Sequence, residues 1–307
     1  MNSYDTIILG AGPAGLTAGI YLARSKVKTL ILSNGMAGGQ MNLTHEIANY
    51  PGVETISGYQ LASIMKKQAL NFGCEIKTNV NIKELSLNGD IKTITLNDGN
   101  QFTAKSVILT PGGRPRNLQI PGEDEFKGRG VSYCATCDGD FFTGKEIVVV
   151  GGGNSALEES ISLTKYASKV TIVHQFDVFQ AFPHIVDEAK KNPKIHFILQ
   201  STLAEIYGNQ NLEGVKIKNL QNNNITEYKT DGVFIFIGYL PNTEFLKNHV
   251  KLNERNEIVV DKNMQTNIKG VYAAGDCIEK KYRQITTAVG EATVAAMSVS
   301  EFIHQSN

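Results

Sequence analysis

The chain has 307 residues, 41% of them hydrophobic, which is enough for about two domains with packed cores. Its 30 Lys and Arg residues balance its 30 Asp and Glu residues, and this zero net charge argues against nucleic acid as a partner. No apolar run approaches the ~18–20 residues that span a bilayer, so the sequence predicts no membrane segment.

The chain begins with a strand, a turn, a helix and a second strand. Residues 5–10 form a short apolar strand, residues 10–15 a glycine-rich turn, residues 14–24 a helix and residues 28–33 the next strand. This order predicts a βαβ unit of the kind that binds dinucleotides. Because the apolar strand starts almost at once, we expect no signal peptide.

The same pattern returns in the middle of the chain. Before it, alternation with a central turn over residues 84–104 predicts a hairpin in the first domain. A strand at 146–150, a turn at 151–156, a helix at 155–166 and a strand at 169–174 then repeat the first unit. We interpret this repeat as an internal duplication.

Two passages rich in Pro and Gly, 111–122 and 238–242, are typical of connections between domains. They separate a middle domain, 116–243, from a discontinuous first domain that consists of residues 1–115 and 244–307. The predicted fold class is therefore α/β, with two Rossmann-like dinucleotide-binding domains.

The first glycine loop has the spacing of a dinucleotide site. Gly10 allows the tight turn, Gly12 lets the backbone approach a pyrophosphate, and Gly15 lets the helix pack on the strand. The phosphate would then lie at the positive end of the helix. Ser33 and Asn34 stand where an acidic residue usually binds the ribose, so a hydroxyl or amide would replace the carboxylate there.

The pair Cys134-Ala-Thr-Cys137 can cycle between a dithiol and a disulfide. Half of a zinc site is disfavoured because no further ligands lie nearby in sequence, and Cys74 and Cys277 are solitary. Four cysteines in a chain of this length indicate a cytoplasmic protein, where a permanent disulfide is disfavoured. We therefore expect a redox-active pair, no metal site, and two buried, unreactive cysteines.

Asp138 directly follows the cysteine pair. A carboxyl group beside a dithiol can return a proton to a departing thiolate if partial burial raises its pKa. The alternative is an exposed turn residue in Asp138-Gly-Asp140. We favour the role of proton donor.

The chain resembles the low-molecular-weight thioredoxin reductases over nearly its whole length. The motifs that carry this resemblance are Gly10-Ala-Gly-Pro-Ala-Gly15, Gly38-Gly39-Gln40, Asn49-Tyr-Pro-Gly52, Lys127-Gly-Arg-Gly-Val-Ser132, Cys134-Ala-Thr-Cys-Asp-Gly139, Gly151-Gly-Gly-Asn-Ser-Ala156, Ile237-Gly-Tyr-Leu-Pro-Asn-Thr243, Ala274-Gly-Asp276 and Tyr282-Arg-Gln-Ile285. The run around the two cysteines is highly specific.

The resemblance implies a homodimer that binds FAD in the first domain and reduces thioredoxin. It implies that reduced flavin passes two electrons to the Cys134–Cys137 disulfide, that Cys137 lies nearer the flavin, and that Cys134 attacks the disulfide of thioredoxin. Asp138 matches the proton donor of the family. The two domains are expected to rotate, so that the cysteines face either the flavin or the partner.

The resemblance also implies which residues contact FAD. The strand and turn that end at Gly275-Asp276 would meet the ribityl and pyrophosphate part of the cofactor. The full set expected from the resemblance is Gly10, Gly12, Pro13, Ala14, Gly15, Ser33, Asn34, Gly39, Gln40, Asn49, Val80, Gly112, Gly275, Asp276, Arg283, Gln284 and Ile285.

The sequence departs from the family after the second glycine loop. In NADPH-using relatives the next strand ends in His-Arg-Arg, with another Arg four residues beyond, and these arginines hold the 2′-phosphate. Here Gln175, Phe176 and Gln180 occupy the three basic positions. Since a charged hydrogen bond is worth ~1.5–3 kcal/mol, losing two weakens NADPH binding by roughly 10²–10⁴-fold. A neutral Gln175 also does not favour NADH, so the second nucleotide site is interpreted as vestigial.

A branch of the family fits this departure: the ferredoxin-dependent flavin thioredoxin reductases. They keep FAD and the cysteine pair and do not use pyridine nucleotide. The resemblance therefore implies reduced ferredoxin as the electron donor. Because ferredoxins are usually acidic, we expect the basic cluster Lys280, Lys281 and Arg283 to contribute to a docking patch.

Other functions stay open at this point. A flavin dithiol oxidase would pass electrons from a small dithiol to oxygen, and an NAD(P)H enzyme could use basic residues placed elsewhere. A redox sensor would bind FAD and change partner affinity with the state of the cysteines. A ferredoxin–NADP⁺ reductase is disfavoured because it does not need the cysteine pair.

Overall fold

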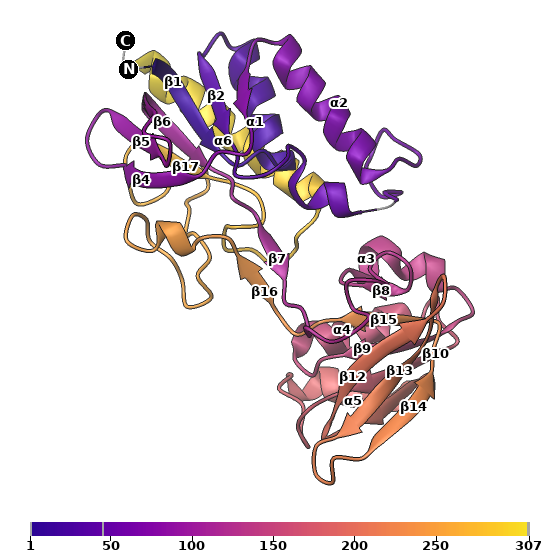
Figure 1. The fold of residues 1–307 in the computed structure, drawn as a ribbon. Coiled ribbons are helices and arrows are strands. Elements are labelled where there is room, and N and C mark those ends of the chain that lie inside the picture. The colour runs from indigo at the N-terminus through magenta and orange to yellow at the C-terminus, as the bar shows by residue number, and fades with distance from the viewer. Residues whose placement is uncertain (1, 45, 306–307) are drawn as a thin grey trace. The chain divides into compact units, whose positions relative to one another are not determined.

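The computed structural model describes residues 2–44 and 46–305 of the chain. The chain divides into two compact units, one formed by Met1–Arg114 with Leu240–Asn307 and the other by Pro115–Tyr239 (Figure 1). Both crossings between the units fall in the two Pro- and Gly-rich passages. The crossing segments pair with each other as the short strands β7 (Gly113–Pro115) and β16 (Tyr239–Pro241).

The first unit is built on a seven-stranded sheet with the order β3-β2-β1-β6-β5-β4, in which β17 also pairs with β6. Its strands are β1 (Asn2–Leu9), β2 (Thr29–Leu32), β3 (Glu75–Lys77), β4 (Ile82–Ser86), β5 (Lys92–Leu96), β6 (Gln101–Leu109) and β17 (Val271–Ala273). The neighbours β3, β2, β1, β6 and β17 pair in parallel, whereas β4, β5 and β6 form an antiparallel meander.

Both faces of this sheet are covered. Helices α1 (Pro13–Arg24), α2 (Gly58–Asn71) and α6 (Ile285–Gln305) pack on the face to which Ile8 belongs. The neighbouring residues Ile7 and Leu9 point to the opposite face, where they meet apolar side chains of the meander and of the segment 246–278. Alternation along a strand thus supplies two cores, as the period of two requires.

The second unit has a parallel sheet with the order β11-β10-β9-β15-β8 and a separate antiparallel sheet with the order β12-β13-β14. The strands are β8 (Val131–Ser132), β9 (Glu146–Val150), β10 (Lys169–Val173), β11 (Ile195–Ile198), β12 (Ser201–Gly208), β13 (Leu212–Asn219), β14 (Ile225–Lys229) and β15 (Gly232–Ile235). Its helices are α3 (Ala135–Asp138), α4 (Asn154–Leu163) and α5 (Pro183–Lys191). Ile147 and Val149 face the helices, and Val148 and Val150 face the antiparallel sheet.

The predicted repeat is present as two strand–turn–helix–strand units. The strand predicted at 146–150 matches β9, and the helix predicted at 14–24 matches α1 to within one residue. The hairpin predicted over 84–104 is only part of a larger element. Its strands β4 and β5 pair as expected, but a turn connects β5 to β6, which pairs antiparallel with β5 on one side and parallel with β1 over Phe102–Leu109 on the other.

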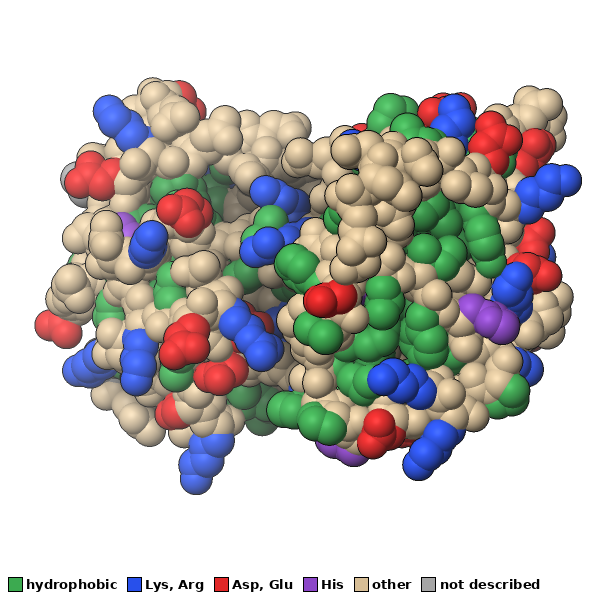
Figure 2. All heavy atoms as spheres, turned by 90° about the horizontal axis from the view of Figure 1, so that it is seen from below, with side chains coloured by type: hydrophobic (Ala, Val, Ile, Leu, Met, Phe, Trp, Pro, Cys, Tyr) green, Lys and Arg blue, Asp and Glu red, His purple; other side chains and the backbone are tan. Residues whose placement is uncertain are grey.

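Charges of both signs are interspersed over the face shown in Figure 2, with hydrophobic side chains gathered between them. In the described part of the chain, no helix is both long and apolar enough to cross a membrane. Within the same residues, no group of three or more His, Cys, Asp or Glu side chains could hold a metal ion.

Phe234 tests how much the core of the second unit contributes to stability. Its side chain is fully buried, and its ring lies 5.0 Å from that of Phe142 in an edge-on contact. Phe234→Ala is expected to lower the free energy of unfolding by about 3–5 kcal/mol, because it removes this burial and leaves a cavity. Urea unfolding of the purified protein measures the change.

The matched control is Phe182→Ala, since Phe182 is 59% exposed. A surface change of this kind is expected to stay within about 0.5 kcal/mol. Equal effects of the two substitutions would contradict the assignment of Phe234 to the core.

Candidate active site

The first glycine loop brings β1 and α1 into close contact. Gly10 has φ +116°, and a Cβ on it would lie 2.1 Å from the carbonyl oxygen of Thr110. A Cβ on Gly15 would lie 1.9 Å from the carbonyl oxygen of Gly10. Both positions therefore require glycine.

The N-terminus of α1 faces open space. Gly12 is the N-cap, supplies no side chain, and has nothing within 4 Å of the place where a Cβ would be. Pro13 occupies the first turn, where its missing N–H costs nothing. The N–H groups of this turn can therefore receive a phosphate.

Two further loops meet this turn. The N–H of Gly38 donates to the carbonyl oxygen of Ala11 at 2.8 Å, and a Cβ on Gly39 would lie 3.2 Å from Cα of Gly12. Gly275 adopts φ +85°, and a Cβ on it would lie 2.9 Å from Cβ of Ala14. Main chain thus approaches the start of α1 from both sides, while Gln40 beside it is exposed.

Ser33 stands at the end of β2, as expected for a residue that binds a ribose. It is buried, its N–H donates to Lys77, and its carbonyl oxygen accepts the N–H of Val80 at 3.0 Å. Asn34 next to it is exposed. The structure therefore places Ser33 and Val80 together at the carboxyl edge of the sheet.

Asp276 carries a buried acceptor. Its Oδ1 atom is shielded from solvent and accepts no hydrogen bond from the described residues, although Nζ of Lys280 lies 3.3 Å away in an ion pair. A buried carboxylate oxygen without a donor is costly unless a ligand supplies one. A hydroxyl group of a bound cofactor fits this position.

The remaining predicted contacts also lie in the first unit. Arg283 donates from Nε to the carbonyl oxygen of Asp276 at 3.4 Å, and Asn49 donates to Oε1 of Gln284 at 3.3 Å. Ile285 is the first residue of α6, and Gly112 adopts φ +64° just before β7.

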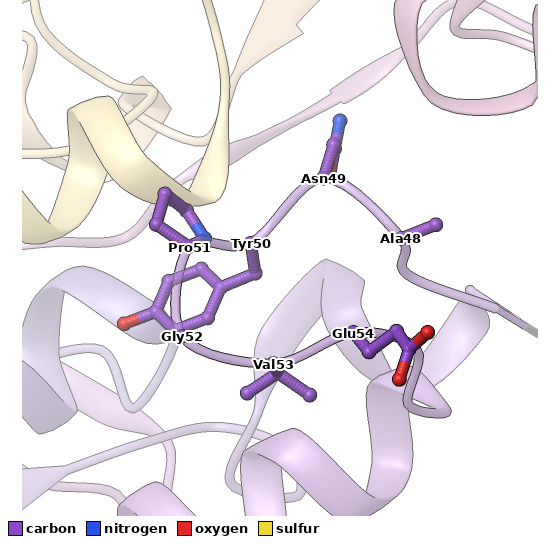
Figure 3. A pocket seen from close by; sticks show the side chains of 7 residues that line it. All are labelled: Ala48, Asn49, Tyr50, Pro51, Gly52, Val53 and Glu54. Atoms are coloured by element: carbon purple, nitrogen blue, oxygen red, sulfur yellow. The ribbon is translucent and has the colours of Figure 1, made fainter.

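Asn49 belongs to a loop that curls around a pocket of about 520 Å³, lined by Ala48, Asn49, Tyr50, Pro51, Gly52, Val53 and Glu54. Figure 3 shows the Asn49 side chain directed away from the curl of this loop. The pocket is formed by one continuous segment, whereas the expected cofactor residues come from both ends of the first unit.

The basic cluster near the C-terminus is not the exposed patch that the sequence indicates. The side chain of Lys280 is 9% exposed and forms ion pairs with Asp276 and Glu291. Arg283 is paired with the buried carboxylate of Glu257. Of the three residues Lys281 is exposed, whereas Lys280 and Arg283 are partly buried, and docking of ferredoxin at this cluster stays a prediction.

The cysteine pair lies at the end of β8 in the second unit. Cys134 and Cys137 form a disulfide with a Cα–Cα distance of 5.3 Å, and both are half-buried. Sγ of Cys134 accepts the N–H of Cys137 at 3.1 Å at the start of α3. The pair is thus held between the end of β8 and the first turn of α3, partly exposed.

Asp138 sits beside the pair and is also half-buried. Burial raises the pKa of its carboxyl group, the hydroxyl of Ser132 opposes this by donating a hydrogen bond, and Asp140 adds to the increase in pKa. Ser132 was not among the predicted site residues. The sequence carries no signal that singles it out, because the contacts of a serine hydroxyl group depend on the fold.

The other two cysteines lie apart from this chemistry. Cys74 and Cys277 are buried thiols, and burial raises the pKa of each to about 12. A thiol of such high pKa carries almost no thiolate at neutral pH. Their expected inert role agrees with this environment.

The second glycine loop repeats the backbone of the first. Gly151 has φ +143°, and the ring of His174 lies where a Cβ on Gly152 would be. The N–H of Gln180 donates to the carbonyl oxygen of Gly152 at 2.8 Å. Position 180 is therefore next to the loop, and a neutral side chain stands there.

Comparison with known proteins agrees with this geometry. Residues 4–292 match the family model described as pyridine nucleotide-disulphide oxidoreductase. A "34.2 kDa protein in rubredoxin operon" of Clostridium pasteurianum is 44% identical, with 97% of each chain covered. A thioredoxin reductase of Peptoclostridium acidaminophilum is 44% identical, with 98% of each chain covered.

Among solved structures, the thioredoxin reductase of Streptococcus pyogenes is 41% identical, with 99% of each chain covered and a TM-score of 0.95. This likeness confirms the predicted fold class of two dinucleotide-binding domains. The chain therefore belongs to the pyridine nucleotide-disulphide oxidoreductase family, as a thioredoxin reductase-like flavoprotein whose cofactor is FAD.

Proposed function

We propose that this protein reduces the disulfide of thioredoxin with Cys134 and Cys137, and that its electrons come from reduced ferredoxin and not from NADPH. The observation that carries the choice of donor is the loss of every basic side chain between His174 and Phe182. The name thioredoxin reductase, borne by relatives over the full length of this chain, supports the substrate.

The first unit is proposed as the FAD-binding domain. The start of α1 at Gly12 would hold the pyrophosphate, Ser33 the ribose, and the Oδ1 atom of Asp276 a hydroxyl group of the cofactor. Bound FAD supplies a redox centre that takes up electrons from the donor and passes them on as a pair. The predicted homodimer stays a prediction.

The cysteines carry out the exchange with thioredoxin. Once the pair is reduced, the thiolate of Cys134 attacks the disulfide of thioredoxin and forms a mixed disulfide. Cys137 then attacks Sγ of Cys134, which restores the bond seen here and releases reduced thioredoxin. The short helix α3 keeps the two sulfur atoms within reach throughout.

Asp138 is proposed as the proton donor of this exchange. Its raised pKa keeps part of the carboxyl groups protonated at a pH where an exposed aspartate is ionised. A protonated carboxyl beside the pair can neutralise the thiolate that leaves. The rate should therefore fall as the pH rises through the pKa of Asp138.

The second glycine loop is proposed to be a vestigial nucleotide site. Gln180 bonds to the loop through its main chain, and Phe176, 48% exposed, follows the end of β10. Neither side chain carries a positive charge, so neither can form an ion pair with a 2′-phosphate. Without two charged hydrogen bonds, NADPH binding is weaker by ~3–6 kcal/mol.

Ferredoxin can drive the reaction. A low-potential ferredoxin lies near −400 mV and thioredoxin near −270 mV, a gap of about 130 mV. For two electrons this gap releases ~6 kcal/mol, at about 1.4 kcal/mol for each 30 mV. Reduction of thioredoxin by ferredoxin is thus downhill with no contribution from a nucleotide.

Anaerobic mixing of the holoenzyme with each donor tests the proposal. Reduced ferredoxin is expected to bleach the visible flavin absorbance and then to reduce added thioredoxin, while NADPH and NADH leave the flavin oxidised. Dithionite, which reduces flavin chemically, serves as the positive control. Prompt bleaching by NADPH would contradict the choice of donor, and rapid peroxide formation with dithiols in air would indicate a dithiol oxidase.

Restoring the basic side chains tests the reason for this choice. The triple variant Gln175→Arg, Phe176→Arg, Gln180→Arg is expected to bind NADPH roughly 10²–10⁴-fold more tightly than the parent, because it regains charged hydrogen bonds to the 2′-phosphate. Calorimetric titration gives the two dissociation constants. NADH, which lacks that phosphate, should gain much less.

The matched control places three arginines at exposed positions outside the glycine loop and outside residues 174–180, in the variant Asn88→Arg, Ile91→Arg, Gln210→Arg. It adds the same net charge, so it reports any general attraction of NADPH. If both triple variants gain equally, the missing arginines do not explain the selectivity.

A trapped intermediate shows which of the two cysteines attacks thioredoxin and which one resolves the mixed disulfide. Cys137→Ser removes the thiol that resolves the mixed disulfide, so it should accumulate a covalent complex between Cys134 and thioredoxin. Cys134→Ser should form no such complex. Mass spectrometry under non-reducing conditions detects the adduct, and trapping by Cys134→Ser alone would reverse the assigned roles.

A further inference from the structure

One hydroxyl group connects the cysteine pair with Asp138. Ser132 ends β8 and is 4% exposed. Its Oγ atom lies 2.5 Å from Oδ2 of Asp138, 3.1 Å from the amide nitrogen of Cys134, and 3.4 Å from the carbonyl oxygen of Cys134. Three possible hydrogen bonds thus converge on a single buried atom.

A hydroxyl group has one hydrogen to donate and two lone pairs that accept. When Asp138 is ionised, Ser132 accepts the N–H of Cys134 and donates its hydrogen to Oδ2 of Asp138. When Asp138 is protonated, the carboxyl group can donate to Oγ instead. The hydrogen of Ser132 then turns toward the carbonyl oxygen of Cys134.

We infer that Ser132 is a positioning residue that keeps Asp138 attached to the main chain of Cys134 in both protonation states. Rotation of one hydroxyl hydrogen exchanges the two bonding patterns, and no heavy atom has to move. The inference deepens the proposed function, on which the role of Asp138 as proton donor rests.

The proton count of the exchange shows why both states are needed. The thiol of Cys137 and the protonated carboxyl group of Asp138 together bring two protons, and thioredoxin leaves with two. Asp138 gives its proton to the first thiolate that leaves thioredoxin, regains one from the thiol of Cys137 as this sulfur attacks Cys134, and gives that proton to the second thiolate. Asp138 takes up a proton again when the Cys134–Cys137 disulfide is next reduced. The carboxyl group therefore alternates between its protonated and ionised forms in each cycle. A hydrogen-bond partner that could bind only one of these forms would lose its contact with Asp138 in the other.

The hydroxyl also acts on the balance between these states. Burial raises the pKa of Asp138, and the bond from Ser132 lowers it again by stabilising the ionised form. Removing the hydroxyl should therefore raise this pKa further. Since the protonated form is the donor, the loss of activity toward alkaline pH should move to higher pH.

Ser132→Ala is the variant that tests the inference. The holoenzyme is reduced with dithionite, freed of excess reductant, and mixed with thioredoxin in a single turnover over a range of pH. The alkaline limb of the rate profile is expected to shift to higher pH in Ser132→Ala, and to return toward the parent position in Ser132→Thr, which keeps the hydroxyl. Ser168→Ala, which removes an exposed hydroxyl group outside the cysteine motif in the second unit, should leave the limb unchanged.

A second readout follows the carboxyl group itself. Infrared difference spectra of the holoenzyme, with Asp138→Asn to assign the band, show the pH at which Asp138 ionises. This pH should rise in Ser132→Ala. If the variant does not fold, Ser132→Gly removes the same hydroxyl and takes its place.

An unchanged limb and an unchanged ionisation in a folded variant would overturn the inference. Failure of the parent to reduce thioredoxin would instead overturn the proposed function. The infrared titration would still decide the role of Ser132 in that case, because it needs neither thioredoxin nor a physiological donor.

Discussion

The missing side chain at Gly15 is the constraint on which the cofactor end of the first unit depends. A Cβ there would lie 1.9 Å from the carbonyl oxygen of Gly10, so α1 can start against the end of β1 only if this residue is glycine. The close start turns the first N–H groups of α1 toward open space at Gly12. Gly275 approaches the same turn, since a Cβ on it would lie 2.9 Å from Cβ of Ala14, and Asp276 follows it directly in the chain.

The second unit shows that this backbone device does not by itself select a ligand. Gly151 makes the same kind of turn between β9 and α4, with φ +143°. Selection between NADPH and NADH is expected to depend on the side chains that follow the next strand. Gln175 and Phe176 at these positions carry neither a positive charge for a 2′-phosphate nor a negative charge for a ribose. Under the proposed function, the second unit would keep the backbone geometry of this turn without binding NADPH.

Secondary-structure elements that depend on a local sequence pattern could be predicted from the sequence. β9 and α1 could be predicted because an apolar run or a glycine-rich turn marks their ends. Partners distant in sequence could not be predicted in the same way. From the sequence alone, Lys280 is expected to be a surface charge. In the fold it forms an ion pair with Glu291 of α6, and both side chains are largely buried. The role of Ser132 was missed for a similar reason, since a serine in a sequence does not show what its hydroxyl touches.

Depth of burial divides the four cysteines into two kinds. Cys74 and Cys277 lie inside cores, where the missing solvation of a thiolate raises the pKa of each to about 12. Cys134 and Cys137 lie just after the end of β8 and are only half-buried. The same depth is enough to raise the pKa of Asp138. In the proposed function this strand end would serve both needs, because the cysteines are exposed enough for thiol exchange and the carboxyl group of Asp138 is buried enough to have a raised pKa.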